Sequence, residues 1–342
     1  MTAFPHSSAP PRVQVHRQTS SGRIALVLFA LAVIGLVAMP WWAKTGTIRM
    51  VLELCCYIAV AQMWNMLAGY AGLVSVGQQA FMGAAGYALF VLAQTFGINP
   101  FLAIFLSLLA PAVLAVPCYL LLHRLDGPYF AIGTWVVAEV FRLAASNLGW
   151  LNAGAGMSLS VMKDYSAFER NVAMSLLCAL MILVTIGGSY WFLRSRYGLA
   201  LIAMRDNPVA AASQGVDVKR LRFMIYVAAA VGCGLVGSVY FMAQLRINPP
   251  SAFDPMWSNI AIFIVMVGGI ASIEGVLIGA LIYFIADRWF GEYGASYFVV
   301  LGLMTVLVAL SARSGIWGMI SKRWDAPWFP IRRHLTLTKE TP

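Results

Sequence analysis

Long apolar runs, separated by short polar or basic stretches, dominate this chain. An α-helix needs about 20 mostly apolar residues to cross a bilayer, so runs near that length predict spanning helices. One such helix ends near Thr95, and another begins after Leu125. The others are predicted over 24–43, 48–67, 101–122, 172–193, 223–244 and 295–310. The pattern predicts an all-α, polytopic integral membrane protein with about ten transmembrane helices, within a range of eight to ten.

Two glycine-rich segments interrupt this pattern, the first over 69–87 and the second over 268–280. Glycine weakens a helix by roughly 1 kcal/mol relative to alanine, and it lets another backbone approach closely. The run 257–267 is too short to cross a bilayer alone, so it predicts either a broken helix or two short spans that meet at 268–275. A re-entrant segment there would lower the count to eight spans. Helix breaks are predicted at Gly72, Gly77, Gly268, Gly269 and Gly275.

The composition supports a membrane protein. Hydrophobic residues make up 61% of the chain and charged residues 11%, against roughly 45–50% and 25% in soluble domains. The net charge of +10 resides in tails and loops and forms no basic face, so lipid is expected as a partner and nucleic acid is not.

The distribution of charge also predicts the topology. With ten spans and an inner N-terminus, sixteen of the 23 Lys and Arg residues fall on the inner side and six on the outer. The positive-inside rule then places both termini and residues 194–222 in the cytoplasm. Three regions follow: a disordered basic cytoplasmic tail over 1–23, a transmembrane domain over 24–312 and a basic cytoplasmic tail over 313–342.

A short polar segment between two apolar runs carries helix start and stop signals. Asp206 or Asn207 can cap a helix start, Pro208 suits the first helical position, and Gly215 suits the left-handed residue past the end. These signals predict a helix over 208–214. So short a helix is marginal alone in water, so we expect it to dock on something. An ordinary capped loop is the alternative.

Polar side chains inside the predicted spans are candidates for a translocation path, because lipid cannot satisfy their hydrogen bonds. These candidates are Asn65, Ser75, Gln78 and Glu139. Glu139 and Arg142 lie three residues apart, on one helical face where they can neutralise each other. A charge at bilayer depth favours a functional site, and a salt bridge that only fixes the rotation of the helix is the alternative. For the first glycine-rich segment, the alternative is a packing face of small residues.

Enzymatic and metal chemistry are not predicted. The sequence has no phosphate-binding loop, no His/Cys metal spacing and no nucleophile elbow. We therefore expect no catalytic residue, no metal and no cofactor bound by this chain. Buried, unpaired thiols are predicted for the cysteines, because all of them lie in apolar runs: Cys55, Cys56, Cys118, Cys178 and Cys233.

Four segments resemble branched-chain amino acid permease subunits of ABC importers, in the order of that family and over about 48–318. The stretch 205–216 is similar to the family's coupling helix, but Pro208 and Ala212 stand where the family usually has Glu. The glycine-rich stretch 69–87 matches the family's Gly-x-x-Gly-x-x-Ser-x-Gly-Gln-x-Ala-Phe-x-Gly signature. The stretch 125–142 resembles a third motif, which ends in the Glu-x-x-Arg of Glu139 and Arg142. The stretch 268–280 resembles a fourth, with Ala271 and Val276 in place of a Gly and a Pro.

The resemblance implies a permease subunit of the bacterial inner membrane that imports leucine, isoleucine or valine. Its implied partners are a second homologous permease subunit, two cytoplasmic ABC ATPases that bind the ATP, and a periplasmic substrate-binding protein. Urea, amides and other small solutes are alternative substrates in the same family, and an autonomous secondary transporter is a further alternative. The residues implied to couple to the ATPase are Arg205, Asp206, Asn207, Pro208, Ala210, Ala211 and Gly215.

Overall fold

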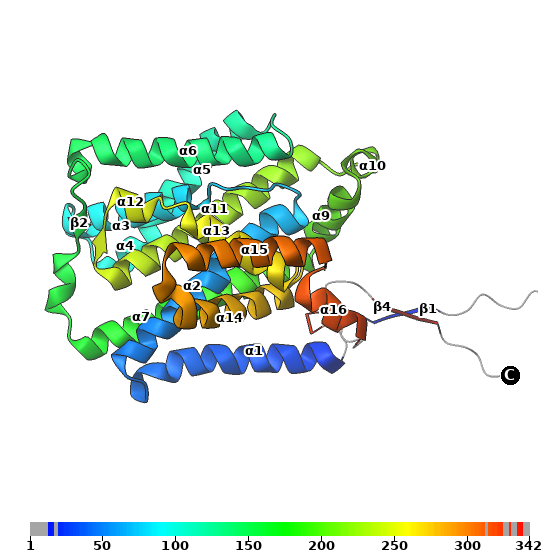
Figure 1. Cartoon of the computed structure of the whole chain (residues 1–342), viewed down its shortest axis with the longest axis horizontal. Coiled ribbons are helices and arrows are strands. Elements are labelled where there is room, and N and C mark those ends of the chain that lie inside the picture. The colour runs from blue at the N-terminus through cyan, green and yellow to red at the C-terminus, as the bar shows by residue number, and fades with distance from the viewer. Residues whose placement is uncertain (1–12, 17–19, 312–313, 324–327, 330–333, 338–342) are drawn as a thin grey trace, which may run out of the picture.

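The computed structural model describes residues 13–16, 20–311, 314–323, 328–329 and 334–337. Most of these residues are helical, and the long helices run side by side along one axis (Figure 1). The α-helices are α1 Ser20–Ala38, α2 Thr45–Asn65, α3 Gln78–Gln94, α4 Pro100–Ser107, α5 Leu109–Leu122, α6 Pro128–Asn147, α7 Ala167–Ile182, α8 Gly188–Leu193, α9 Arg196–Asp206, α10 Pro208–Ser213, α11 Val218–Gln244, α12 Pro249–Ala252, α13 Met256–Gly268, α14 Ile273–Phe290, α15 Ala295–Ser311 and α16 Gly315–Arg323. Shorter 3₁₀ or π elements are η1 Met39–Trp41, η2 Met66–Tyr70, η3 Gly149–Leu151, η4 Ser160–Asp164, η5 Leu183–Gly187 and η6 Gly291–Tyr293.

Eight helical stretches in the described part of the chain are long and apolar enough to cross a membrane. They are Gly22–Trp41, Thr45–Tyr70, Pro100–Leu122, Pro128–Asn147, Ala167–Leu193, Val218–Gln244, Pro249–Gly268 and Val299–Ser321. The 17-residue α3 and the 18-residue α14 lie within the bundle as well, packed against α11 and α13 respectively. The prediction of an all-α polytopic membrane protein with eight to ten spans is therefore confirmed.

The two ends of the bundle differ in structure. At one end, on the right of Figure 1, α9, α10 and α16 extend beyond the long helices; we call this the α10 end. At the opposite end, called the β2 end, β2 (Met157–Ser158) pairs with β3 (Arg246–Ile247). Beyond the α10 end, β1 (Val13–His16) pairs antiparallel with β4 (His334–Leu337), in the register Val13 opposite Leu337.

The tail expected to be disordered over 1–23 contains regular elements in the part that the structure describes. β1 occupies Val13–His16, and α1 begins at Ser20, before the predicted start of the first span. Residues 1–12 and 17–19 lie outside the described residues.

Burial divides the bundle into a core and a periphery. In the spans of α2 and α11, 72% and 67% of the residues are buried, against 17% in the α1 span, 22% in α6 and 12% over Val299–Ser321. Small residues let the core helices approach closely. A Cβ added to Gly237 of α11, for example, would collide with the backbone of Met82 in α3. The five cysteines are buried and form no disulfide, as predicted.

The segment around the second glycine-rich motif forms a helical hairpin. α13 ends at Gly268 and α14 begins at Ile273, so the two-helix alternative describes it. Gly268 faces Gly275 and Gly279 faces Ile264, at distances that leave no room for a side chain, which makes the pair antiparallel. The turn between them includes Gly269, with a φ of 140°, and Ala271, with a φ of 58°. Gly275 therefore lies in the first turn of α14, where it permits the close packing of the hairpin.

Proline shapes the predicted span over 101–122. It consists of α4 and α5, which meet at Leu108. Pro111 has no N–H to donate to the carbonyl of Ser107, four residues earlier, so the helical hydrogen bonding is interrupted between α4 and α5. Pro117 lies inside α5 without ending it.

Candidate functional site

The start of α10 is fixed by its own sequence. Asn207, with φ −155° and ψ 102°, is the N-cap, and its Oδ1 accepts hydrogen bonds from the backbone N–H groups of Val209 at 3.1 Å and Ala210 at 3.0 Å. Pro208 occupies the first helical position, where its missing N–H has no intrahelical partner to lose. Of the two predicted caps, Asn207 and not Asp206 begins the helix.

The end of α10 is a glycine-dependent cap. The backbone N–H of Val216 donates to the carbonyl of Ala211 at 3.1 Å, and that of Gly215 donates to the carbonyl of Ala212 at 3.0 Å. This pair of bonds requires a left-handed residue just past the helix, and Gly215 has a φ of 87°. The helix ends at Ser213, one residue before the predicted end.

One side of α10 packs on the bundle and the other is exposed. Ala211 is only 3% exposed and belongs to the hydrophobic core, whereas Val209 is 79% exposed. α9 supports this arrangement, because its Leu201 and Met204 are buried and it packs against α8 and α11. The alanines of α10 thus divide, with Ala211 seating the helix and Ala210 and Ala212 exposed. The result is a short helix held at a fixed place and presenting an outward face.

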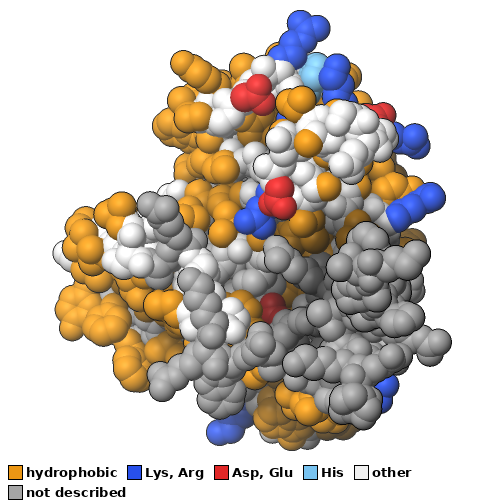
Figure 2. Space-filling view, turned by 90° about the vertical axis from the view of Figure 1, so that its right-hand side faces the viewer, with side chains coloured by type: hydrophobic (Ala, Val, Ile, Leu, Met, Phe, Trp, Pro, Cys, Tyr) orange, Lys and Arg blue, Asp and Glu red, His pale blue; other side chains and the backbone are white. Residues whose placement is uncertain are grey.

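Charged residues surround this face. Figure 2 views the α10 end and shows Lys and Arg side chains gathered over its upper half, beside the grey residues that are not described. Asp217 caps α11, accepting a hydrogen bond from the backbone of Arg220 at 3.0 Å. The exposed cations near α9, α10 and the start of α11 are Arg196, Arg205, Lys219 and Arg220, and the exposed acids are Asp206 and Asp217.

A second polar site ties α2 to the hairpin turn between α13 and α14. Asn65, fully buried at the end of α2, accepts a hydrogen bond on Oδ1 from the backbone N–H of Ala271 at 2.8 Å. Its Nδ2 donates to the carbonyl of Ser272 at 3.1 Å. Gly69, one turn further along, lies so close to Asn65 and Ala271 that it has no room for a Cβ. One side chain therefore holds together elements that are about 200 residues apart in sequence.

The chain between η2 and α3 is not helical, yet side chains satisfy its backbone inside the bundle. The indole of Trp64 donates to the carbonyl of Ser75 at 2.7 Å, and the N–H of Val76 donates to Oγ1 of Thr134 on α6 at 3.0 Å. The N–H of Gln78 donates to Oγ of Ser258 on α13 at 3.2 Å. Irregular backbone is tolerated at membrane depth only with such partners. α2, α6 and α13 therefore all hold this segment in place.

Thr134→Val tests this description of the segment. The change keeps the shape of the side chain but leaves the half-buried N–H of Val76 without its acceptor, so we expect a loss of about 1–3 kcal/mol in stability. Thermal unfolding of the purified protein in detergent measures it. The control is Thr305→Val, because the bond that Thr305 Oγ1 makes among the described residues is to the carbonyl of Leu301 in its own helix. Equal unfolding midpoints for the two variants would contradict the description.

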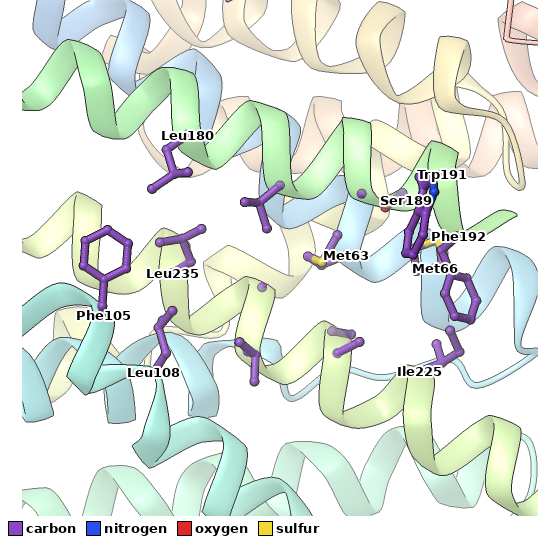
Figure 3. Close-up of a pocket in the computed structure, with 16 residues that line it drawn as sticks. Met63, Met66, Phe105, Leu108, Leu180, Ser189, Trp191, Phe192, Ile225 and Leu235 are labelled. Atoms are coloured by element: carbon purple, nitrogen blue, oxygen red, sulfur yellow. The ribbon is translucent and has the colours of Figure 1, made fainter. Parts of the chain in front are cut away.

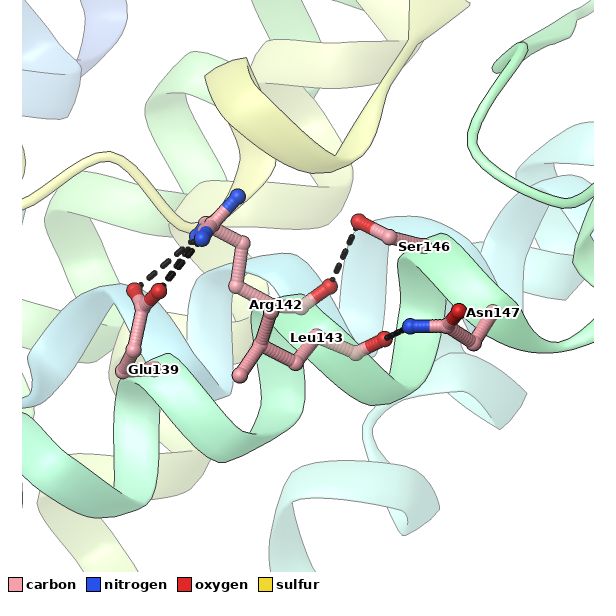
Figure 4. Close-up of polar contacts among 5 residues, drawn as sticks. All are labelled: Glu139, Arg142, Leu143, Ser146 and Asn147. Carbon is pink, nitrogen blue, oxygen red and sulfur yellow. Dashed lines mark hydrogen bonds and ion pairs between the residues drawn. The ribbon is translucent and has the colours of Figure 1, made fainter.

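The predicted path residues fall into two separate places in the structure. Asn65, Ser75 and Gln78 are buried side chains around the two helix breaks, and each bonds within the chain. Glu139 lies apart from them on α6, paired with Arg142 on the same helix (Figure 4).

Sequence reasoning missed further members of the buried polar site. Ser258 donates to Oε1 of Gln79 as well as accepting from Gln78, so it bridges the start of α3 to α13. Gln62 is fully buried in α2, and neither atom of its amide has a partner among the described residues. A polar residue inside the apolar run 48–67 was the available signal for Gln62. Ser258 carried no such signal, because it lies at the start of the short run 257–267.

A cavity of about 560 Å³ lies between α2, α4, α7, α8 and α11 (Figure 3). Its lining is almost wholly apolar, with Met63, Phe105, Leu180 and Trp191 among its walls and Ser189 as a polar exception. An amino acid carries an ammonium and a carboxylate, which such walls cannot solvate. The cavity suits hydrocarbon, and we place no translocation site there.

Comparison with known proteins identifies the family. The model of the family described as the branched-chain amino acid transport system permease component matches residues 46–310. The chain is 22% identical over 340 residues to the high-affinity branched-chain amino acid transport system permease protein LivM of Salmonella typhimurium, an overlap covering 92% of this chain and 80% of that protein. It is also 22% identical to LivM of Escherichia coli over 317 residues, covering 85% and 74% of the two chains.

An archaeal relative agrees with these. The chain is 25% identical over 253 residues to the probable branched-chain amino acid transport permease protein LivH of Methanocaldococcus jannaschii, covering 69% of this chain and 78% of that protein. Because the family model matches well over half of the residues, the chain belongs to the family of branched-chain amino acid transport system permease components.

Proposed function

We propose that this chain is the permease subunit of an ABC importer and that α10 is its coupling helix, the contact through which a separate ATPase drives transport. The observation that carries this proposal is the way α10 packs on the bundle. Both of its ends are capped, Ala211 is buried against the bundle, and Val209 projects from it. A rigid helix with an exposed face can transmit a push from a partner. Rocking of the spans as rigid bodies then opens the path to alternate sides of the membrane.

The remaining components follow from this role. Two cytoplasmic ATPase subunits bind and hydrolyse the ATP, and this chain itself carries no catalytic site. A second homologous permease completes the path, and a periplasmic binding protein delivers the substrate. The residues that form or hold the ATPase contact are those of 205–216, namely Arg205, Asp206, Asn207, Pro208, Ala210, Ala211 and Gly215.

In the proposed orientation, the α10 end lies on the cytoplasmic side of a bacterial inner membrane. Both termini lie on the same side. Support comes from the excess of Lys and Arg in the segments assigned to that side.

Ser213→Cys tests the orientation. We expect a membrane-impermeant maleimide to label Cys at this exposed position only after spheroplasts are permeabilised. A cysteine in place of the exposed Lys163 near the β2 end should be labelled in intact spheroplasts. The native cysteines are all buried and should give little background. Labelling of the Ser213→Cys variant from the periplasmic side alone would reverse the assigned orientation and remove α10 from reach of an ATPase.

The substrate is a branched-chain amino acid: leucine, isoleucine or valine. Support comes from the family description and from the names of the three relatives. Uptake in a strain that lacks this chain tests the substrate, with labelled leucine compared against urea and a short amide. Restored leucine uptake that requires the ATPase genes is the expected result. Restored urea or amide uptake alone would assign another substrate of the same fold, and uptake independent of any ATPase would indicate a secondary transporter.

A further inference from the structure

An outer helix of the bundle carries two charges near its middle. At 1.5 Å per residue, Glu139 lies about 2 Å along the axis from the midpoint of α6 and Arg142 about 7 Å from it. The 20 residues of α6 match the roughly 30 Å thickness of the hydrocarbon layer. Both charged residues therefore lie at hydrocarbon depth.

These charges are not enclosed by the rest of the chain. The side chain of Arg142 is 32% exposed and that of Glu139 is 42% exposed, and only 22% of the α6 span is buried. Figure 4 shows the two side chains meeting alongside α6. Contact with lipid tails would leave the remaining polar surface of both groups unsatisfied, which membrane proteins avoid.

The other exposed helices differ from α6. The α1 span is 17% buried, and its one charged residue, Arg23, lies in its first turn. α15, in a span that is 12% buried, has no charged residue, and neither do α4 and α5. Those helices have the composition expected of a surface that faces lipid. α6 is as exposed as they are, but it carries the charged residues Glu139 and Arg142 near its middle.

Among the residues that the structure describes, the pair also forms no bond between helices. The ion pair of Glu53 and Arg288, at 2.9 Å, links α2 to α14. Glu139 and Arg142 belong to one helix, and Arg142 bonds Glu139 through Nε and Nη2. Among the described residues, no hydrogen bond is made by its Nη1. Donors on Arg142 thus remain for another molecule.

We propose that a second permease subunit of the same fold packs on the face of α6 formed by Ile132, Trp135, Glu139, Arg142 and Leu143, and that Glu139 and Arg142 contact it. We call this the Glu139 face. The inference rests on the proposed function, because that function supplies the partner. Soluble ATPases and a periplasmic binding protein cannot reach hydrocarbon depth, so the second permease is the component of the importer that can. The interface would carry the Glu139–Arg142 pair at its centre, shielded from lipid.

Site-specific photo-cross-linking in the intact membrane complex tests this inference. A photoreactive amino acid replaces Trp135 or Leu143, which are 51% and 48% exposed on the Glu139 face. The controls replace Leu31 of α1 and Leu303 of α15, which are 57% and 59% exposed. We expect both α6 positions to form an adduct with a permease subunit, identified by mass spectrometry, and both controls to form none. Absence of that adduct at Trp135 and Leu143, or an equal adduct from α1, would overturn the proposal.

A charge exchange separates partner contact from a structural role in α6. Glu139→Arg combined with Arg142→Glu keeps an ion pair within the helix but reverses its polarity. If the pair contacts the partner, the adduct from Trp135 is lost. An unchanged adduct would mean that the pair only stabilises α6, and would contradict the proposed contact.

The same preparation distinguishes failure of this inference from failure of the proposed function. If the complex retains its ATPases and imports leucine while the permease adduct forms only from another helix, the interface is wrong and the function holds. If no ATPase co-purifies and uptake persists, the function itself is wrong.

Discussion

Ala211→Glu should abolish uptake while the chain still inserts in the membrane. Ala211 is 3% exposed and packs α10 against the bundle, so the new carboxylate would lack both space and a partner. Burying an unpaired charge costs several kcal/mol, far more than a helix of six residues gains from its own hydrogen bonds. α10 would therefore no longer pack against the bundle, and the proposed contact with the ATPase would be lost. Leucine uptake in the deletion strain measures the effect, and immunoblotting of membranes measures insertion.

The neighbouring residue provides the matched control. Ala212 is exposed and stands where the family usually has Glu, so Ala212→Glu adds the same charge without burying it and is compatible with a docked ATPase. We expect that variant to insert and to retain uptake. If Ala212→Glu abolished uptake as completely as Ala211→Glu, the cause would be the added charge and not the lost packing of α10.

Gly215→Pro should have the same effect as Ala211→Glu by another route. Proline holds φ near −65°, whereas Gly215 has a φ of 87°, and proline also lacks the N–H that donates to Ala212. Asparagine tolerates the left-handed conformation, so Gly215→Asn should keep most of the uptake. Normal uptake by either Gly215→Pro or Ala211→Glu would contradict the role given to α10.

Asn65→Ala should be the most destabilising single polar substitution in the bundle. It removes two hydrogen bonds and leaves the N–H of Ala271 and the carbonyl of Ser272 without their partner. The expected loss is about 2–4 kcal/mol, because a buried group left unsatisfied costs more than the bond itself contributes. Thermal unfolding in detergent measures it. Uptake should fall as well, because Asn65 connects α2 to the hairpin of α13 and α14.

Two further variants test whether the lost stability comes from the hydrogen bonds of Asn65. Asn65→Asp keeps an acceptor for Ala271 but loses the donor to Ser272, so its unfolding midpoint should fall below that of the unmodified protein. Asn147→Ala is the control, because Asn147 is exposed and, within the described part of the chain, its side chain bonds to Leu143 of its own helix alone. That change should have almost no effect on stability. Equal losses for Asn65→Ala and Asn147→Ala would show that Asn65 does not hold the two elements together.

Local signals allowed the ends of α10 to be predicted from the sequence. A cap depends on residues within a few positions of the helix end, and the sequence contains Asn207, Pro208 and Gly215 at the required spacing. The spanning helices could also be predicted from the sequence, since length and apolar content define them. The hairpin at Gly268 was predicted as one of two alternatives, because glycine marks a break without giving the direction of the chain after it.

The partners of the buried polar residues could not be predicted. Asn65 bonds to a turn more than 200 positions away, and Gln79 bonds to Ser258 on α13. Such contacts depend on which helices are neighbours, and a single apolar run contains no information on that. For the same reason, Glu139 was grouped with Asn65, Ser75 and Gln78 by polarity alone, although the structure places it on an outer helix.

The central claim is that an ATPase docks on the outward face of α10, and cross-linking from Val209 tests it most directly. Val209 is 79% exposed on that face, and Trp150, 66% exposed in η3 at the opposite end, serves as the control. With a photoreactive amino acid at each position in the assembled, transporting complex, we expect an adduct with the ATPase subunit from position 209 and none from position 150. A complex that imports leucine but yields no ATPase adduct from position 209 would contradict the account.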